Sequence, residues 1–363
     1  MDKPKIQGVP GRYWHTLDDG RIQCDLCPRL CRLKAGQRGL CFVRQRVGEE
    51  MRLMTYGRSS GFCVDPIEKK PLNHFLPGTA ILSFGTAGCN LTCKFCQNWD
   101  ISKARAFDRL QDEASPDEIA AAAQAAGARA VAFTYNDPVI FLEYAVDAAA
   151  ACRARGLKTV AVTAGYITAQ ARPEFFAAMD AANVDLKGFT EGFYRKLCAG
   201  ALAPVLETLS YIRHETDTWL EITTLLIPGQ NDSDAEIKAL SKWVSDELGP
   251  DVPLHFTGFH PDWRMRDIPA TPSATLTRAR SIAQEQGLNF VYTGNVFDPE
   301  RQTTYCPQCA KPAIGRDGYT ITSWGLGQGG FCTSCGAGVP GVFEEKPGNW
   351  GERRRPVTIH HAA

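Results

Sequence analysis

Three cysteines, Cys89, Cys93 and Cys96, lie at C-x3-C-x2-C spacing in the stretch AILSFGTAGCNLTCKFC. An apolar run at 81–84 precedes them, so the sequence predicts a buried strand that ends in a loop carrying all three thiols. Three neighbouring thiolates can hold three irons of a [4Fe–4S] cluster, whereas a cluster bound wholly by protein takes four cysteines. The spacing indicates an iron–sulfur site with one iron open to a small molecule; a zinc knuckle and simple packing are the alternatives.

Two further groups of four cysteines lie towards the ends of the chain, and each predicts a closed metal site. The first has the spacing C-x2-C-x3-C-x9-C, which is not the ferredoxin run, and it suits either zinc or a second iron–sulfur site. The second consists of two C-x2-C pairs, the pattern of a zinc ribbon or of a rubredoxin-like pair of hairpins. The residues are Cys24, Cys27, Cys31 and Cys41 in the first group, and Cys306, Cys309, Cys332 and Cys335 in the second.

The composition is that of an ordinary globular protein, with 44% hydrophobic and 22% charged residues in a chain of 363. Lys+Arg and Asp+Glu both number 40, so the net charge indicates neither nucleic acid nor an anionic membrane as a partner. A local basic patch for nucleic acid would not show in this total. No apolar run is long enough to span a bilayer, and the N-terminus has no apolar core for secretion. We therefore expect a cytoplasmic protein whose 14 cysteines serve as metal ligands rather than in disulfides.

The chain divides into four parts. We predict an N-terminal Cys-rich module with an ordered linker at 1–79, a β/α region at 80–297, a metal ribbon at 298–345 and a frayed tail at 346–363. In the second part, strand-like runs alternate with helical stretches, which implies an α/β fold with a parallel sheet in a partial (β/α)6-type barrel. The predicted strands are 81–84, 130–134, 158–163, 183–186, 219–227, 254–259 and 289–293. The expected helix caps are Ser115, Ser233 and Thr271.

Polar side chains gather where the predicted strands end, which is where β/α barrels carry their chemistry. Asp185 and Lys187 share one face of an extended segment and form either a plain ion pair or a binding site. The other candidates are Asn136 and Asp137 after the second strand, Thr163 and Tyr166 after the third, Glu221 on the fifth, and His260 after the sixth.

Several stretches together resemble the radical S-adenosylmethionine (SAM) superfamily. QCDLCPRLC, VDPIEKKPLNHFLPG, GCNLTCKFCQNWDIS, VDLKGF and TTLLIPGQND resemble the branch related to the pyruvate formate-lyase activating enzyme. That branch includes the radical SAM enzyme of the AmmeMemoRadiSam system. True glycyl-radical activases carry Asp-Gly-Pro-Gly-Ile-Arg before the cluster strand and His-Asn after the third cysteine. This chain has neither, since Cys96 is followed by Gln97-Asn98-Trp99.

The resemblance implies that SAM chelates the open iron and that strand-end residues bind the rest of SAM. Asn136-Asp137-Pro138 stands where relatives carry Asn-Glu-Pro, which binds the SAM amino group. Ala164 replaces the Asn of a Thr-Asn-Gly-Tyr stretch. The SAM contacts implied in this way are Asn136, Asp137, Thr163, Tyr166, Asp185, Lys187 and Glu221.

The resemblance also implies an enzyme that reductively cleaves SAM to a 5′-deoxyadenosyl radical, which takes hydrogen from an unidentified substrate. The expected cofactors are a [4Fe–4S] cluster, SAM, and zinc at one or two sites. The expected partners are an electron donor such as flavodoxin or ferredoxin, and Memo-type proteins. One alternative function is to install a glycyl radical on a partner protein. A second alternative is a zinc and iron–sulfur binding protein without turnover.

The linker at 61–79 carries three prolines and interleaves charged with large apolar residues. Because the apolar residues need burial, we predict that the linker packs on the barrel rather than acting as a loose tether. It would then bring Lys70 or His74 near the substrate space, with His260 as a further substrate candidate. We also predict that Cys24–Cys41 form a lid over the barrel mouth, and that removal of 298–363 costs stability more than chemistry.

Overall fold

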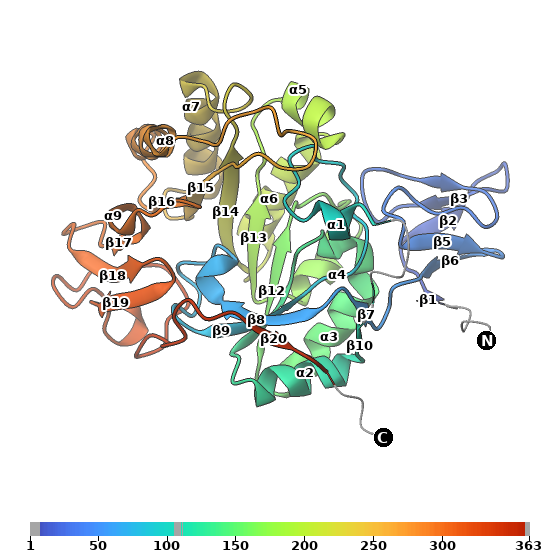
Figure 1. Ribbon diagram of the computed structural model, residues 1–363, viewed down its shortest axis with the longest axis horizontal. Helices are drawn as coiled ribbons and strands as arrows, with labels where there is room; N and C mark the ends of the chain where they lie inside the picture. Colours follow the sequence, from blue (N-terminus) through green and yellow to red (C-terminus); the bar gives the residue numbers. More distant parts are fainter. Residues whose placement is uncertain (1–7, 105–109, 111, 360–363) are drawn as a thin grey trace.

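The central element is a nine-stranded sheet in the order β16-β15-β14-β13-β12-β11-β9-β8-β20 (Figure 1). The computed structural model describes residues 8–104, 110 and 112–359. The first seven residues of the predicted N-terminal module and the last four of the predicted tail lie outside this description. From β9 to β16 the strands follow chain order and pair in parallel, so the predicted α/β fold with a parallel sheet is confirmed.

The parallel strands lie close to the predicted runs, and every residue of β9 and β11 is buried. Continuous burial of this kind is expected where both faces of a parallel sheet are covered. The strands are β9 (Ala80–Phe84), β11 (Ala130–Phe133), β12 (Lys158–Thr163), β13 (Ala181–Asp185), β14 (Trp219–Leu226), β15 (Leu254–Gly258) and β16 (Val291–Gly294).

The helices begin close to the predicted caps, with one exception. Ser115 and Glu118 form a capping box, and the Ser233 side chain accepts the Glu236 backbone N–H. Thr271 caps nothing: its hydroxyl donates to Leu226 O at 2.6 Å and accepts the Phe259 N–H at 2.9 Å, so it ties two loops together. The helices are α2 (Pro116–Ala125), α3 (Leu142–Ala154), α4 (Arg172–Ala177), α6 (Ala203–Glu215), α7 (Asp234–Trp243) and α8 (Ser273–Glu285), with short α1 (Trp99–Ser102) and α5 (Glu191–Phe193).

The predicted linker belongs to the barrel. β8 (Phe62–Pro66) pairs antiparallel with β9, and the segment that follows contributes fully buried Ile67 and Leu72. The prediction that the linker packs on the barrel is confirmed. On the far side of β8, β20 (Arg355–Val357) adds a further antiparallel strand. The expected frayed tail is therefore wrong at these residues, because the free edge of β8 offers unpaired backbone groups to the end of the chain.

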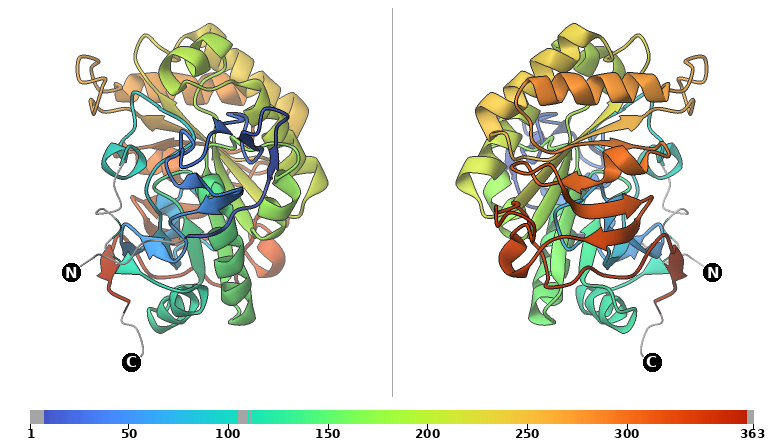
Figure 2. Two further views of the ribbon diagram at one scale, coloured as in Figure 1. Left: turned by 90° about the vertical axis from the view of Figure 1, so that its right-hand side faces the viewer. Right: turned by 90° about the vertical axis from the view of Figure 1, so that its left-hand side faces the viewer.

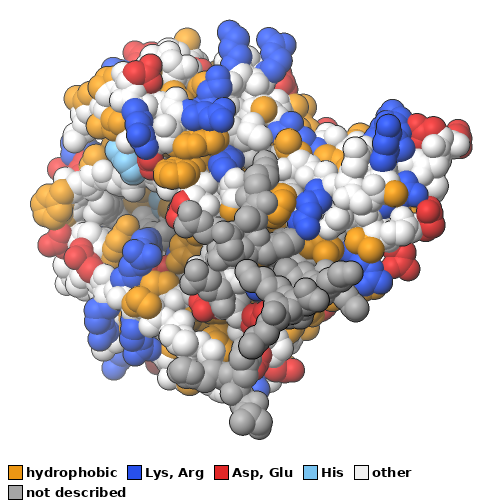
Figure 3. Space-filling model, turned by 45° about the vertical axis from the view of Figure 1, so that its right-hand side comes forward, with side chains coloured by type: hydrophobic (Ala, Val, Ile, Leu, Met, Phe, Trp, Pro, Cys, Tyr) orange, Lys and Arg blue, Asp and Glu red, His pale blue; other side chains and the backbone are white. Residues whose placement is uncertain are grey.

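Two small modules flank the barrel on opposite sides (Figures 1 and 2). On the surface shown in Figure 3, Lys and Arg side chains are interspersed with Asp and Glu side chains, in line with their equal totals. Among the described helices, none combines the length and apolarity needed to cross a bilayer. The N-terminal module has β1 (Val9–Pro10), β2 (Trp14–Thr16), β3 (Ile22–Cys24), β4 (Arg32–Leu33), β5 (Arg44–Val47) and β6 (Glu50–Leu53), followed by β7 (Arg58–Ser59), which pairs with β10 (Asp112–Glu113). The C-terminal module has α9 (Pro299–Gln302), β17 (Thr304–Tyr305), β18 (Pro312–Asp317) and β19 (Thr320–Trp324).

Candidate functional site

A cavity of about 390 Å³ opens at the carboxyl ends of the parallel strands. One wall is the loop after β9, with all three cysteines of the C-x3-C-x2-C motif. The floor comes from the ends of β11 to β16, and residues from the linker and the C-terminal module complete the wall. Lining residues used below are Cys89, Cys93, Cys96, Lys70, Lys103, Asn136, Asp137, Thr163, Asp185, Lys187, Thr223 and Tyr319.

Asn136 holds the cysteine loop in place. Its side-chain oxygen accepts the Thr86 N–H at 3.0 Å, and its amide donates to Gly88 O at 2.9 Å. Gly85 allows the segment around Asn136 to lie this close to the cysteine loop, because a Cβ at residue 85 would overlap the carbonyl oxygen of Thr134. Asn136 thus lies in the cavity wall, but its side chain is committed to the loop.

The three thiols are surrounded by polar and positive groups. Burial raises the pKa of Cys89 to about 12, and the nearby Lys103 acts to lower it. The Cys96 sulfur lies 2.9 Å from the Ser102 hydroxyl. Burial and the Asp137 carboxylate outweigh Lys103 in setting the pKa of Cys89, so this thiol would release its proton on binding a metal, because the thiolate is the form that ligates.

Asp137 carries the one carboxylate oxygen in this cavity that is buried and unpaired in the described part of the chain. Its Oδ1 accepts the Thr163 hydroxyl at 2.9 Å and the Val139 N–H at 3.1 Å, while Oδ2 has no partner. Burial raises the pKa of Asp137 to about 6, although these hydrogen bonds oppose the rise. Thr223 also presents a buried hydroxyl without a partner. An orphaned carboxylate oxygen fits a cationic ammonium group.

A second charged group faces the cavity from the linker. Lys70 Nζ lies 2.7 Å from Asp65 Oδ2 and 5.1 Å from the centre of the Tyr135 ring, and the Tyr135 hydroxyl donates to the same carboxylate at 3.1 Å. Burial lowers the pKa of Lys70 to about 8, although Asp65 opposes this. Sequence reasoning identified Lys70 but missed Asp65, Tyr135 and Tyr319. The spacing of Asp65 and Lys70 matches neither strand nor helix periodicity, because β8 ends at Pro66 and a short helical turn follows at Ile67–Lys69.

The remaining candidates divide between the cavity wall and its surroundings. Asp185 and Lys187 line the cavity as an ion pair, with Nζ and Oδ2 separated by 2.7 Å. Tyr166 stands outside the described lining, and its carbonyl oxygen accepts the Asn90 side-chain amide at 2.9 Å. His260 is exposed at the rim, with Nδ1 3.1 Å from the Gln97 amide nitrogen.

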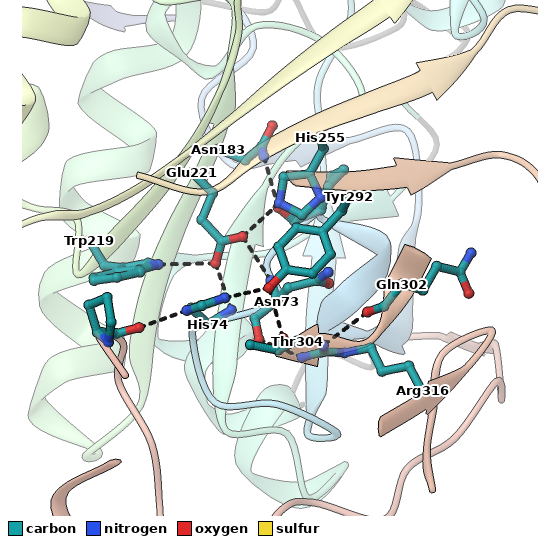
Figure 4. Close-up of polar contacts among 12 residues, drawn as sticks. Asn73, His74, Asn183, Trp219, Glu221, His255, Tyr292, Gln302, Thr304 and Arg316 are labelled. Atoms are coloured by element: carbon teal, nitrogen blue, oxygen red, sulfur yellow. Dashed lines mark hydrogen bonds and ion pairs between the residues drawn. The ribbon is translucent and has the colours of Figure 1, made fainter. Parts of the chain in front are cut away.

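Glu221 and His74 lie away from the described cavity lining, in a buried network at the other end of the barrel (Figure 4). The fully buried Glu221 carboxylate accepts the backbone N–H groups of Asn73 and His74, the Trp219 indole and His255 Nε2, at 2.7–3.0 Å. Of the two linker residues predicted near the substrate space, Lys70 or His74, Lys70 lines the cavity and His74 does not, because the linker carries His74 to the amino ends of the strands. Glu221 itself is near the start of β14 and points into this network.

His74 joins this network to the C-terminal module. Its Nδ1 lies 2.7 Å from Pro340 O, so Nδ1 bears the proton, and Nε2 accepts the Tyr292 hydroxyl at 2.6 Å. Arg316 donates to Asn73 O at 2.6 Å. Burial lowers the pKa of His74 to about 4, which keeps the ring neutral. Residues of the linker, β14, β15, β16 and the C-terminal module therefore meet in one buried network.

The C-terminal cysteines form a site that suits one metal ion. Their four sulfurs lie within 4.8 Å of one another, with 3.6 Å between Cys306 and Cys335 and 3.8 Å between Cys309 and Cys332. The two knuckles match: Ala310 and Gly336 both have positive φ and donate their N–H to the carbonyl of Cys306 and Cys332, respectively. This arrangement is typical of tetrahedral thiolate ligation.

The N-terminal module lies beside the cysteine loop. The described lining of the cavity starts at Lys69 and includes no residue of this module. A Cβ at Gly88 would overlap the carbonyl oxygen of Cys41, and Arg29 Nε donates to Asn90 O at 2.8 Å. The predicted lid is therefore wrong, because the module packs against the outer side of the loop instead of over the mouth.

Comparison with known proteins extends these observations. The model of the radical SAM superfamily matches residues 84–240. The uncharacterized protein MJ0808 of Methanocaldococcus jannaschii is 39% identical over 304 residues, covering 84% of this chain and 90% of that protein. A radical SAM methyltransferase from Sphaerobacter thermophilus has a TM-score of 0.47 at 14% identity, over 78% of this chain and 76% of its own. A domain of a pyruvate-formate lyase-activating enzyme from Bacteroides vulgatus has a TM-score of 0.41 at 16% identity, over 46% of this chain and 99% of its own.

The matched segment 84–240 contains the three cysteines of the loop, Asp137 and the strand ends from β11 to β14. These are the residues that meet in the cavity described above. On the match to the family model, together with a relative that shares most of its length, the chain belongs to the radical SAM superfamily.

Proposed function

We propose that this protein is an enzyme that reductively cleaves SAM at a [4Fe–4S] cluster held by Cys89, Cys93 and Cys96. The observation that carries the proposal is the meeting, in one cavity, of three cysteines and the unpaired buried oxygen of Asp137. When bound and reduced, such a cluster supplies the electron that splits SAM into methionine and a 5′-deoxyadenosyl radical, which then takes hydrogen from a substrate.

The protein's own residues position SAM and shield it. Asp137 Oδ2 receives the SAM ammonium, and Thr163 holds that carboxylate by donating to Oδ1. The Asp185–Lys187 pair and the Thr223 hydroxyl offer donors and acceptors for the ribose and carboxylate of SAM. Lys70 and Tyr319 also line the cavity, where they bound the space left for the substrate.

The direct test is SAM cleavage by the anaerobically reconstituted chain. With iron, sulfide, dithionite and SAM, we expect 5′-deoxyadenosine and methionine in equal amounts, measured by chromatography. Omitting dithionite should stop the reaction, because no electron is then supplied. If the fully reconstituted and reduced protein neither binds nor cleaves SAM, the proposal is wrong and a binding protein without turnover is the better interpretation.

Replacing Asp137 by asparagine should weaken SAM binding by about 10- to 100-fold, because a charge-assisted hydrogen bond contributes about 1.5–3 kcal/mol. The wild-type affinity should also fall as the pH drops through about 6, where the Asp137 carboxylate becomes protonated and loses its charge. The Asn variant should lack this pH dependence. Equilibrium binding of SAM between pH 5 and 8 measures both effects.

A matched control for this measurement is Asp117→Asn in the exposed first turn of α2. It removes one carboxylate without touching the cavity, so both the affinity and its pH dependence should stay those of the wild type. Equal SAM affinities for the Asp137 and Asp117 variants at pH 8 would contradict the role of Asp137.

We propose zinc at the C-terminal site. Replacing Cys309 and Cys335 together by serine should remove about one zinc per chain and lower the melting temperature, because metal binding stabilises such ribbons directly. Metal analysis and thermal unfolding check this. Cys152→Ala, in the core of α3, is the control and should keep its zinc. Unchanged zinc in the double variant, or iron in its place in the wild type, would refute the assignment.

We propose that the electron comes from a flavodoxin- or ferredoxin-type donor and that a Memo-type protein is a partner. Support for the donor is the electron that reductive SAM cleavage consumes, and support for the Memo-type partner comes from the motifs that resemble the AmmeMemoRadiSam branch. A cytoplasmic location is supported by the cysteines, because all 14 are free.

A further inference from the structure

The four N-terminal cysteines surround a small cavity of their own. Cys24, Cys27, Cys31 and Cys41 line it together with Arg44 and Asn90. By the same measure that gives about 390 Å³ for the large cavity, this one has a volume of about 10 Å³, so the four thiols lie around a narrow space. Cys24 and Cys41 are buried, and Cys27 and Cys31 are partly exposed. Four thiols around one space, in a chain whose cysteines are free, indicate a metal centre.

The separation of the sulfurs favours a cluster over a single ion. In the described part of the chain, only the C-terminal cysteines bring three or more ligand atoms within 4.8 Å of one another. Four thiolates on one zinc at 2.3 Å stand about 3.8 Å apart, as the C-terminal sulfurs nearly do. The N-terminal sulfurs are spread more widely, and so are those of Cys89, Cys93 and Cys96. Thiolates that bind irons at separate corners of a cluster need this wider spacing.

An unsatisfied donor at the cavity supports an anionic occupant. Arg44 is 1% exposed, and its two terminal nitrogens bond Glu143 at 2.8 and 2.9 Å, but its Nε has no partner among the described residues. The terminal nitrogen Nη2 of Arg29, also at this cavity, is buried without a partner as well. Buried donors left unpaired are costly, and a cluster with four thiolates and bridging sulfides supplies anionic acceptors.

The cavity adjoins the loop of the first cysteine motif. Gly88 packs so closely on the Cys41 carbonyl that a Cβ would overlap it, and Gly88 directly precedes Cys89. Asn90 lines the N-terminal cavity, whereas its neighbour Cys89 lines the large one. Consecutive residues of one loop therefore form part of both sites.

We propose that Cys24, Cys27, Cys31 and Cys41 hold a [4Fe–4S] cluster that serves as an electron relay beside the SAM site. The relay role rests on the proposed function, whereas the identity of the N-terminal metal does not. A low-potential one-electron donor protein is oxidised at this cluster, which gains the electron and is reoxidised as the electron passes across the Cys41–Gly88 contact towards Cys89. Leu30 and Leu40, 44% and 39% exposed near these cysteines, offer the donor an apolar contact.

The test counts metals in the full chain after anaerobic reconstitution. The wild type should contain about eight irons and about one zinc per chain, because each cluster holds four irons. The triple variant Cys89→Ala, Cys93→Ala, Cys96→Ala should keep about four irons and the electron-spin signal of a reduced [4Fe–4S] cluster. A triple variant with no iron and about two zincs would overturn the proposal.

A second variant and a second readout locate the cluster. Cys27→Ala with Cys31→Ala should lose about four irons and keep the zinc, whereas the control Cys152→Ala should lose neither. In the reduced wild type, spin coupling between neighbouring clusters should broaden the electron-spin signal. A wild-type spectrum equal to the sum of the two single-cluster variants would refute the relay position. If the N-terminal variant does not fold, the triple variant still decides the identity of the metal.

The outcome also separates this inference from the proposed function. If the wild type and the triple variant both hold about four irons, the N-terminal cluster is supported and the cluster at Cys89 is not. If the wild type holds iron and the triple variant holds none, the proposed function stands and the N-terminal cluster does not.

Discussion

Replacing Cys89, Cys93 and Cys96 together by alanine is expected to reduce 5′-deoxyadenosine formation from SAM to background. These are the three cysteines in the large cavity, and the described wall supplies no other thiol. Without them no iron is held in the SAM cavity itself, so the loss should be complete rather than partial. Product formation per chain, measured with excess dithionite and SAM, checks this.

The control for this experiment is Cys152→Ala, which removes a buried thiol from α3 outside all three cysteine groups. It should retain the wild-type rate, because no residue of α3 belongs to the described lining of the large cavity. Residual turnover by the triple alanine variant above that of unreconstituted protein would mean that the electron reaches SAM from another site.

Replacing Glu221 by alanine is expected to destabilise the protein by about 3–5 kcal/mol, the cost of removing one partner from a buried charged network. Four donors would lose their acceptor at a position with no exposure, and His255 would lose the group 2.7 Å from its Nε2. Equilibrium unfolding in urea at pH 7 measures the difference. SAM binding should suffer only through the loss of folded protein.

Asp246→Ala is the matched control, because it removes a carboxylate that is 61% exposed and paired at 2.6 Å with Lys242, which is 63% exposed. An exposed pair of this kind contributes about 0–1 kcal/mol. The hydrogen bonds from His255 and from the Asn73 backbone N–H hold the pKa of Glu221 below its usual value despite burial, so its contribution is present at pH 7 and is lost as the pH falls through that lowered pKa. Equal costs for the two variants would contradict the network.

The repeating β/α pattern could be predicted because its signals are local. Apolar runs mark buried strands, and Ser115 and Ser233 stand where side-chain caps begin helices. The cysteine groups were equally visible, since their ligands are close in sequence. Asp137 was found because it follows a strand directly, and Thr163 because it ends the next one.

The positions of Glu221 and His74 could not be predicted in this way. Both residue types suit an active site. For Glu221, only its position along β14 decides whether its side chain reaches the cavity or the buried network. That position depends on the pairing register with β13, where Asn183 faces Glu221 and Asp185 faces Thr223. Register is set by long-range packing. A difference of two positions along β14 therefore decides whether a side chain lies in the cavity, as Thr223 does, or in the structural network, as Glu221 does.

The contacts of residues 73–76 also determine the order in which this chain can mature. Arg316 binds Asn73, Pro340 binds His74, and the backbones of Phe75 and Val342 pair, across separations of more than 240 residues. During synthesis, the contacts at the amino end of the barrel therefore cannot form until residues 316–342 have left the ribosome. Long-range contacts of this kind slow folding and leave apolar surface exposed meanwhile. A chain cut at residue 297 would be a persistent folding intermediate, prone to aggregation, rather than a barrel that lacks a separate ribbon.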